Sequence, residues 1–182
     1  MRKHPRPQVE FERLVYAGQI GERGTLQELS ATEAERAALV RRFDLMSLER
    51  LEAGVRLREI GKGLARATGR LVADVVQRCV VTLNPVQVRL EKDFSIVFSA
   101  DAAAKVAEIV VAADRDDPPE AMVDGWIDLG EAVVQQFALA LDPYPRVADA
   151  ALPSGCGVGD RSGGDDKTDS PFAVLGPRRI RN

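Results

Sequence analysis

Two runs of alternating apolar and polar residues, on either side of a glycine turn, constrain the fold of this chain most strongly. In Leu51–Leu57 the apolar residues have odd numbers, and the same parity holds in Ala65–Val75. A period of two residues is typical of strands with one buried face. Gly61-Lys62-Gly63 predicts the hairpin loop, because glycine permits the positive φ of tight turns. A three-residue loop would pair Leu57 with Ala67 and Ile60 with Leu64.

A third strand is predicted after a turn at Thr82–Pro85, where the parity changes. The apolar residues now have even numbers, from Val86 to Phe98. Because all three predicted strands follow one another directly, the sequence predicts a three-stranded antiparallel meander.

Four further elements are predicted around this meander. Val9–Tyr16 and Gly24–Ala31 are interpreted as two strands joined by a turn at residues 21–24. Thr32–Phe43 is predicted to be a helix, since Thr32 with Glu35 has the spacing of a capping box.

A second helix is predicted within Ile127–Arg146. Asp128 can cap it, and the Glu131 side chain can accept a hydrogen bond from the backbone N–H of Asp128, as in a capping box. Leu129, Val133, Phe137 and Leu141 then recur every fourth residue, and two prolines end the pattern.

The predicted fold class is α+β, with a meander that stays open or curls toward a partial barrel. Two or three helices pack on it, because 101–113 has both helix and strand character and helix is favoured. Residues 1–150 are expected to form the single domain. Residues 151–182 are expected to be a flexible tail, since 12 of residues 151–170 are Gly, Asp or Ser.

The sequence offers little for catalysis or metal binding. His4 is the only histidine and lies in the basic N-terminal segment, so no Ser-His-Asp or Cys-His arrangement can be built around it. His4, Cys79 and Cys156 are too few for a structural zinc site, which takes four ligands. We therefore expect no catalytic residue, metal, cofactor or small-molecule substrate. Cys79 is interpreted as a core residue at a strand end in preference to a reactive thiol.

The expected location is the cytoplasm. The longest uninterrupted apolar run is too short to span a bilayer, and the basic N-terminus lacks the apolar core of a secretory signal. Two reduced cysteines in a cytoplasmic protein are favoured over a disulfide.

Charge is distributed unevenly along the chain. Residues 1–92 hold 17 Lys and Arg against 12 Asp and Glu, whereas residues 93–182 hold 8 against 16. A basic half indicates contact with a polyanion, although charges that merely solvate the surface would give the same count.

The polar face of the predicted meander collects arginines. The expected register puts Arg58 opposite Arg66, Arg56 opposite Thr68 and Arg70 opposite Gly54. Like charges facing each other across a ladder are destabilising, so a polyanion such as RNA is one explanation and an exposed face made soluble by arginine is the other. The predicted face lacks stacking aromatics, which favours contact with the RNA backbone over base reading. The candidate nucleic-acid-binding residues are Arg56, Arg58, Arg66, Arg70, Arg78 and Arg89.

Three segments resemble a known family when taken together: Gln77–Pro85 (QRCVVTLNP), Ile127–Arg146, and Ser170–Leu175 (SPFAVL). In this order they are similar to the YceD-like family of large ribosomal RNA subunit accumulation proteins, and the resemblance covers about residues 10–175. It implies a non-enzymatic role in accumulation or processing of 23S ribosomal RNA. The implied partners are that RNA or its precursor and a ribosome-assembly protein.

The last of these segments is also a candidate docking site. Pro171, Phe172 and Leu175 form an apolar hook after the acidic tail, which either folds back on the protein or docks on a partner. A protein–protein adaptor that never contacts RNA is therefore the alternative function.

Overall fold

The structure of the protein, a computed structural model, describes residues 10–21, 24–61, 63–100, 118–148 and 150. The ambiguous segment 101–113, Cys156, and the tail 151–182 with its hook lie outside these residues.

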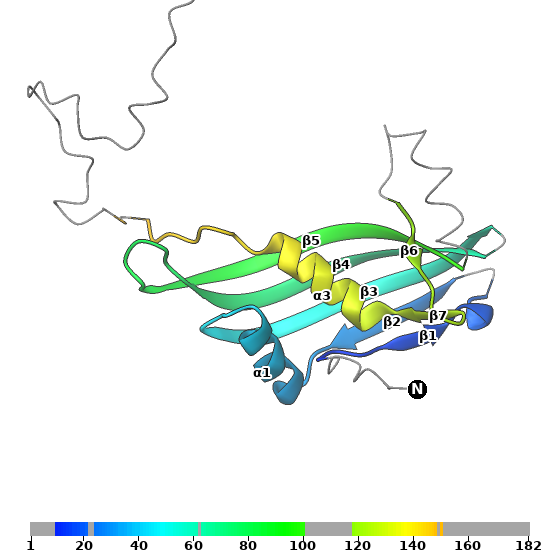
Figure 1. Cartoon of the computed structure of the whole chain (residues 1–182), viewed down its shortest axis with the longest axis horizontal. Coiled ribbons are helices and arrows are strands. Elements are labelled where there is room, and N and C mark those ends of the chain that lie inside the picture. The colour runs from blue at the N-terminus through cyan, green and yellow to red at the C-terminus, as the bar shows by residue number, and fades with distance from the viewer. Residues whose placement is uncertain (1–9, 22–23, 62, 101–117, 149, 151–182) are drawn as a thin grey trace, which may run out of the picture. The chain divides into compact units, whose positions relative to one another are not determined.

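Three long antiparallel strands form the centre of the fold (Figure 1). They are β3 (Ser47–Gly61), β4 (Leu64–Arg78) and β5 (Pro85–Ser99). The predicted meander is therefore confirmed, and Leu57 lies opposite Ala67 as expected. The predicted pairing of Ile60 with Leu64 is wrong. The register shifts after Glu59, so Gly61 takes the place opposite Leu64, as a β-bulge would cause.

Two shorter strands extend this sheet into an open one with the order β2-β3-β4-β5-β6. The strand β2 (Thr25–Ser30) is antiparallel to β3, close to its predicted range. The strand β6 (Glu120–Ala121) is parallel to the last two residues of β5. The sheet therefore does not close into a barrel.

The first strand, β1 (Leu14–Tyr16), lies outside this sheet. The sequence predicted it as a strand joined by a turn to the next one, and in the structure it pairs with β7 (Trp126–Asp128) in a separate two-stranded sheet. The short 3-10 helix η1 (Ala17–Gln19) follows it. Gly130 permits this arrangement, because a Cβ there would lie 2.0 Å from the backbone oxygen of Phe11.

Both predicted helices form, as α1 (Glu33–Arg42) and α3 (Leu129–Ala140). Thr32 and Glu35 make the predicted capping box on α1. Asp128 caps α3 by accepting a hydrogen bond from the Glu131 N–H, 3.1 Å away. The Glu131 carboxylate was expected to accept a hydrogen bond from the Asp128 N–H in return, but it forms an ion pair with Arg42 at 2.8 Å instead.

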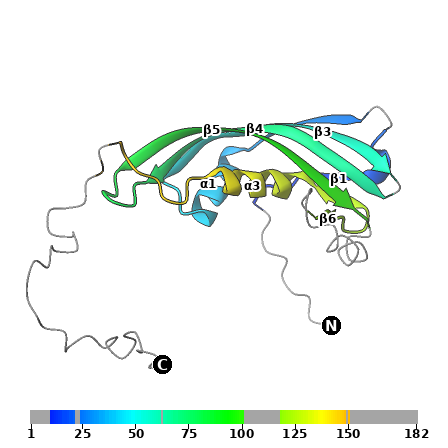
Figure 2. The same ribbon diagram turned by 90° about the horizontal axis from the view of Figure 1, so that it is seen from above.

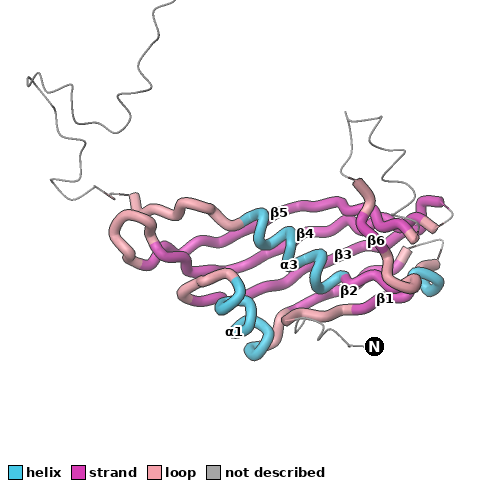
Figure 3. Tube along the Cα trace, in the orientation of Figure 1, coloured by secondary structure: helices cyan, strands magenta, loops and turns pink. Residues whose placement is uncertain are grey.

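The two helices cover the same face of the long strands (Figures 2 and 3). The residues predicted to face the core, such as Val55, Leu57 and Leu71, are fully buried there. Phe137 of α3 packs edge-on against Phe43, with ring centroids 5.7 Å apart. No helix of the described residues is long and apolar enough to cross a membrane.

Candidate nucleic-acid interface

The outer face of the five-stranded sheet is the face turned away from α1 and α3 (Figure 2). Strand alternation puts even-numbered residues of β3, from Glu52 to Arg58, and of β4 on this face, since their odd-numbered neighbours are buried against the helices. In β5 the parity is reversed by the register with β4. All six candidate arginines are exposed and lie on the outer face: Arg56, Arg58, Arg66, Arg70, Arg78 and Arg89.

The predicted cross-strand neighbours of these arginines are confirmed. Arg58 lies opposite Arg66, Arg56 opposite Thr68, and Gly54 opposite Arg70.

Two of the arginines share one carboxylate. Arg70 and Arg89 both form ion pairs with Glu91, and the Nε of Arg89 lies 3.1 Å from the Glu91 oxygen. The hydrogen bonds from Arg70 and then Arg89 hold the pKa of Glu91 below its ordinary value. Arg50 and Glu52 form a further ion pair on the same face. We call this region the mixed-charge zone; it comprises Arg50, Glu52, Arg70, Asp74, Arg89, Glu91 and Asp93.

Three other arginines form what we call the arginine cluster: Arg56, Arg58 and Arg66. They lie near the β3–β4 turn, and none of them has an ion pair with another described residue. Their cross-strand neighbours are uncharged where they are not arginine, namely Leu26, Thr68 and Val97. The cluster is therefore an exposed concentration of positive charge with free guanidinium groups.

Arg78 belongs to neither group. It lies opposite Pro85 at the far end of β4 and lines a cleft of about 550 Å³ that also includes Gln77 and Cys79. The predicted set of six thus divides into three cluster arginines, two neutralised arginines and Arg78.

Cys79 is buried at the end of β4, as the sequence predicted. Its sulfur accepts a hydrogen bond from the Thr82 N–H, 3.4 Å away. Hydrogen bonding by Thr82 lowers the pKa of the Cys79 thiol to about 6, although burial opposes this shift. Within the described part of the chain, no three His, Cys, Asp or Glu residues are grouped to hold a metal ion.

An exposed aromatic pair was not anticipated from the sequence. Tyr16 of β1 lies opposite Trp126 of β7, with ring centroids 5.3 Å apart. No pattern around either residue indicated this contact, because it depends on the pairing of strands from the two ends of the domain. The only available signal was compositional, since the chain has one Trp and two Tyr.

Comparison with known families gives one match. Residues 67–177, more than half of the chain, match the family described as "Large ribosomal RNA subunit accumulation protein YceD". The match includes Arg70, Arg78 and Arg89 and begins directly after Arg66. No curated protein and no solved structure matches the chain.

Proposed function

The chain belongs to the family of large ribosomal RNA subunit accumulation proteins, and on this premise we propose that it promotes the accumulation or processing of 23S ribosomal RNA by binding RNA backbone on its outer face. The family description names an accumulation protein and no catalysed reaction. We therefore propose a non-enzymatic factor in large-subunit assembly, acting in the cytoplasm.

The arginine cluster is the observation that supports this proposal most directly. Arg58 and Arg66 face each other across the ladder and have no acidic partner among the described residues. Directly opposed like charges destabilise a sheet by up to about 1 kcal/mol. A bound polyanion would remove this repulsion, and the planar guanidinium suits phosphate because it gives two parallel hydrogen bonds.

The shape of the surface favours backbone contact over base reading. The described residues of the outer face include no aromatic side chain on which bases could stack. Thr68 adds a hydroxyl between the arginines, which can donate to a phosphate or a ribose oxygen. Such a surface recognises charge and helical shape, and its affinity falls with salt because counterions are released.

The test is binding of purified protein to 23S ribosomal RNA fragments over a salt series, with Arg58→Ser/Arg66→Ser as the variant. Each phosphate contact contributes about 0.7 to 0.9 to the slope of log affinity against log salt. The double variant should therefore reduce the slope by about 1.5 while keeping the circular dichroism spectrum of the folded protein.

The matched control is Arg70→Ser/Arg89→Ser. It removes the same charge from the same face, but both arginines are already held by Glu91. We expect a clearly smaller change in slope. Equal effects of the two variants would contradict a specific role for the cluster, and equally weak binding by wild type and cluster variant would favour the adaptor function.

A protein partner is part of the same proposal. Pro171, Phe172 and Leu175 are proposed to dock on a ribosome-assembly protein, because they form the apolar end of an acidic segment. Deletion of residues 171–175 should release a co-purifying assembly protein without changing the affinity for RNA.

A further inference from the structure

The aromatic pair Tyr16–Trp126 is exposed beyond what the fold requires. The two side chains are 42% and 45% exposed, and their rings are inclined by 53°. On the opposite face of the same two-stranded sheet, Ile127 is buried in the core. The pairing of β1 with β7 therefore needs the apolar side chain of Ile127, but the exposed rings contribute no burial of comparable extent.

The ring of Tyr16 lies close to the backbone at two glycines. A Cβ at Gly18 would lie 2.7 Å from the ring atom Cε1, and a Cβ at Gly125 would lie 3.0 Å from Cε2. A backbone hydrogen bond of 2.9 Å from the Ala17 N–H to the Gly125 oxygen joins the segments that contain these glycines. A side chain at Gly18 would therefore displace the Tyr16 ring from this position.

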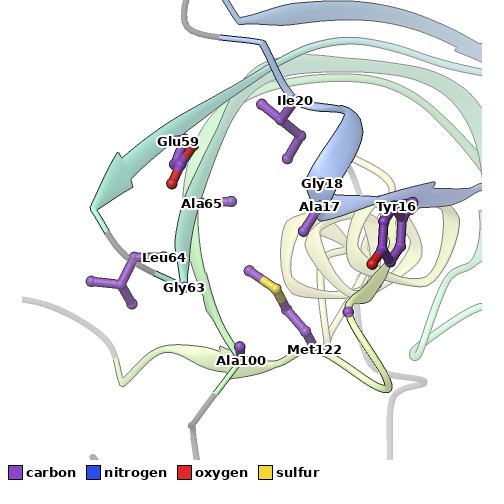
Figure 4. Close-up of a pocket in the computed structure, with 11 residues that line it drawn as sticks. Tyr16, Ala17, Gly18, Ile20, Glu59, Gly63, Leu64, Ala65, Ala100 and Met122 are labelled. Atoms are coloured by element: carbon purple, nitrogen blue, oxygen red, sulfur yellow. The ribbon is translucent and has the colours of Figure 1, made fainter.

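A cavity of about 260 Å³ lies beside this ring (Figure 4). Its walls are apolar at Ile20, Ala65 and Met122, and Glu59 contributes a carboxylate on the side of the β3–β4 turn. Sites for whole small molecules are larger, about 300–1,000 Å³. A cavity of this size and lining suits one flat ring that carries a hydrogen-bond donor.

The cavity and the arginine cluster lie on two faces of the same hairpin end. Glu59 follows Arg58 directly, and Ala65 directly precedes Arg66. Because side chains alternate along a strand, the cavity lining faces inward where the arginines face outward. An RNA strand held by the cluster has only to cross the turn to reach the cavity.

We propose that Tyr16, Trp126 and the adjoining cavity bind one unpaired base of RNA, which stacks on the aromatic pair and donates its exocyclic amino group to the Glu59 carboxylate. This inference rests on the proposed function, because the cluster supplies the RNA strand. Aromatic side chains stack on any base, whereas a carboxylate acceptor selects bases with an amino donor. The charge of the neighbouring cluster favours RNA over an apolar protein segment as the occupant.

Trp126 provides the experiment, because it is the only tryptophan of the chain. The full-length protein is titrated with single-stranded RNA oligonucleotides while Trp126 fluorescence and the anisotropy of end-labelled RNA are recorded. Stacking should quench the fluorescence in parallel with binding. Inorganic polyphosphate, which offers charge without bases, should bind the arginines and leave the fluorescence unchanged.

Variants then separate stacking from charge. Tyr16→Ala should weaken binding of the oligonucleotide by about 5- to 150-fold, the range for loss of one stacked base. The salt slope should stay unchanged, since a stacked base releases no counterion. Tyr16→Phe should restore the affinity. The matched control is Tyr144→Ala, which removes an aromatic side chain that is 70% exposed and does not line the cavity.

Base identity tests the role assigned to Glu59. Oligo(A) and oligo(C) should bind more tightly than oligo(U), which lacks an exocyclic amino group, and Glu59→Gln should reduce that preference. Equal affinities of the wild-type protein for the three oligonucleotides, or a preference that Glu59→Gln leaves unchanged, would overturn this part of the proposal.

Failure of the inference and failure of the proposed function are distinguishable. RNA that binds with unchanged Trp126 fluorescence and with equal affinity for Tyr16→Ala would overturn the stacking site and leave the cluster intact. Quenching by polyphosphate equal to that by RNA would also overturn it. Absence of RNA binding by the wild-type protein would overturn both, and loss of a bound protein in Tyr16→Ala would assign the pair to a protein interface.

Discussion

The arginine cluster and the mixed-charge zone lie on one face of one sheet, yet they differ in electrostatic character. In the zone, Glu91 receives hydrogen bonds from Arg70 and Arg89. In the cluster, Arg58 faces Arg66 with no carboxylate partner among the described residues. Both regions are built from the same alternation of exposed polar residues along β3, β4 and β5.

The difference shows that the number of arginines on a sheet does not determine its potential. The cross-strand neighbours of the arginines determine this electrostatic potential, because the Cβ atoms of residues opposite each other lie within about 5.5 Å. On β5, Glu91 forms ion pairs with two arginines and Asp93 lies directly opposite Arg70, whereas Val97 opposite Arg66 offers no carboxylate. Among the described residues, a polyanion therefore meets three arginines without ion pairs at the turn end of the face, and Arg78 alone at the far end.

The largest effect is expected when a carboxylate is added to the cluster. Thr68→Glu would place an acid opposite Arg56 and two residues from Arg66 on the same strand, so that one carboxylate could pair with two arginines. Loss of two phosphate contacts should lower the affinity for 23S ribosomal RNA fragments by about thirtyfold near 0.1 M salt. Urea unfolding should show no loss of stability, because opposed charges replace like ones. Unchanged affinity would contradict the cluster as the binding surface, and Thr68→Gln is the uncharged control.

A smaller effect is expected on the stability of the fold. It should distinguish ion pairs that stabilise the fold from ion pairs that only cancel charge. Arg13 hydrogen-bonds Glu35 at 2.8 Å and, as the main cause, lowers the pKa of Glu35 to about 2. A depressed folded-state pKa adds stability that is complete above the ordinary value of 4.5 and is lost as the pH falls toward about 2.

Glu35→Gln should therefore lower the free energy of unfolding at pH 7 by about 1–2 kcal/mol after allowance for solvent screening. The variant should also lose less stability than the wild type between pH 4.5 and 2.5, measured by urea unfolding. The exposed Glu91 provides the comparison, since Glu91→Gln should leave stability at pH 7 nearly unchanged. Equal destabilisation by both variants would show that the two kinds of ion pair do not differ.

The smallest effect on RNA affinity is expected for the converse change, which is removal of a carboxylate from the mixed-charge zone. Glu91→Gln should remove the ion pairs of Arg70 and Arg89 with this residue, while Asp93 stays opposite Arg70 and Asp74 stays opposite Arg89. The affinity for RNA should rise severalfold and the salt slope should steepen by about 1, if one of the two arginines gains a phosphate. A shallower slope or weaker binding would indicate that the zone lies outside the reach of the RNA.

Local patterns predicted most of the fold. Alternation predicted the three central strands and, with the assumed loop length, the register of β3 with β4 up to Glu59, because a one-residue slip would expose every core side chain. The capping box of Thr32 and Glu35 similarly depends on residues three apart. The pairing of β1 with β7 could not be predicted, since neither three-residue strand has a period that specifies its partner. Nor could the ion pair between Glu131 and Arg42, which are 89 residues apart.

The sequence predicted which arginines lie on the outer face, but not which of them form ion pairs. Alternation sufficed to place six arginines on one face, but it could not predict the ion pairs of Glu91 with Arg70 and Arg89, because the reach of these side chains across β4 and β5 depends on rotamers. Tyr16 and Trp126 meet only through strands from opposite ends of the domain, so the aromatic pair was beyond any local pattern.

The pairing of β1 with β7 has a consequence for synthesis of the chain. Arg13 donates its N–H to Asp128, 115 residues later. At about 5–20 residues per second, translation separates these residues by on the order of 10 s. During that interval the meander can form from hairpins, while Phe11, which is 1% exposed in the folded protein, has no α3 against which to be buried. The strand β1 therefore cannot pair until β7 has been synthesised, and until then its side chains are available to a chaperone that binds nascent chains.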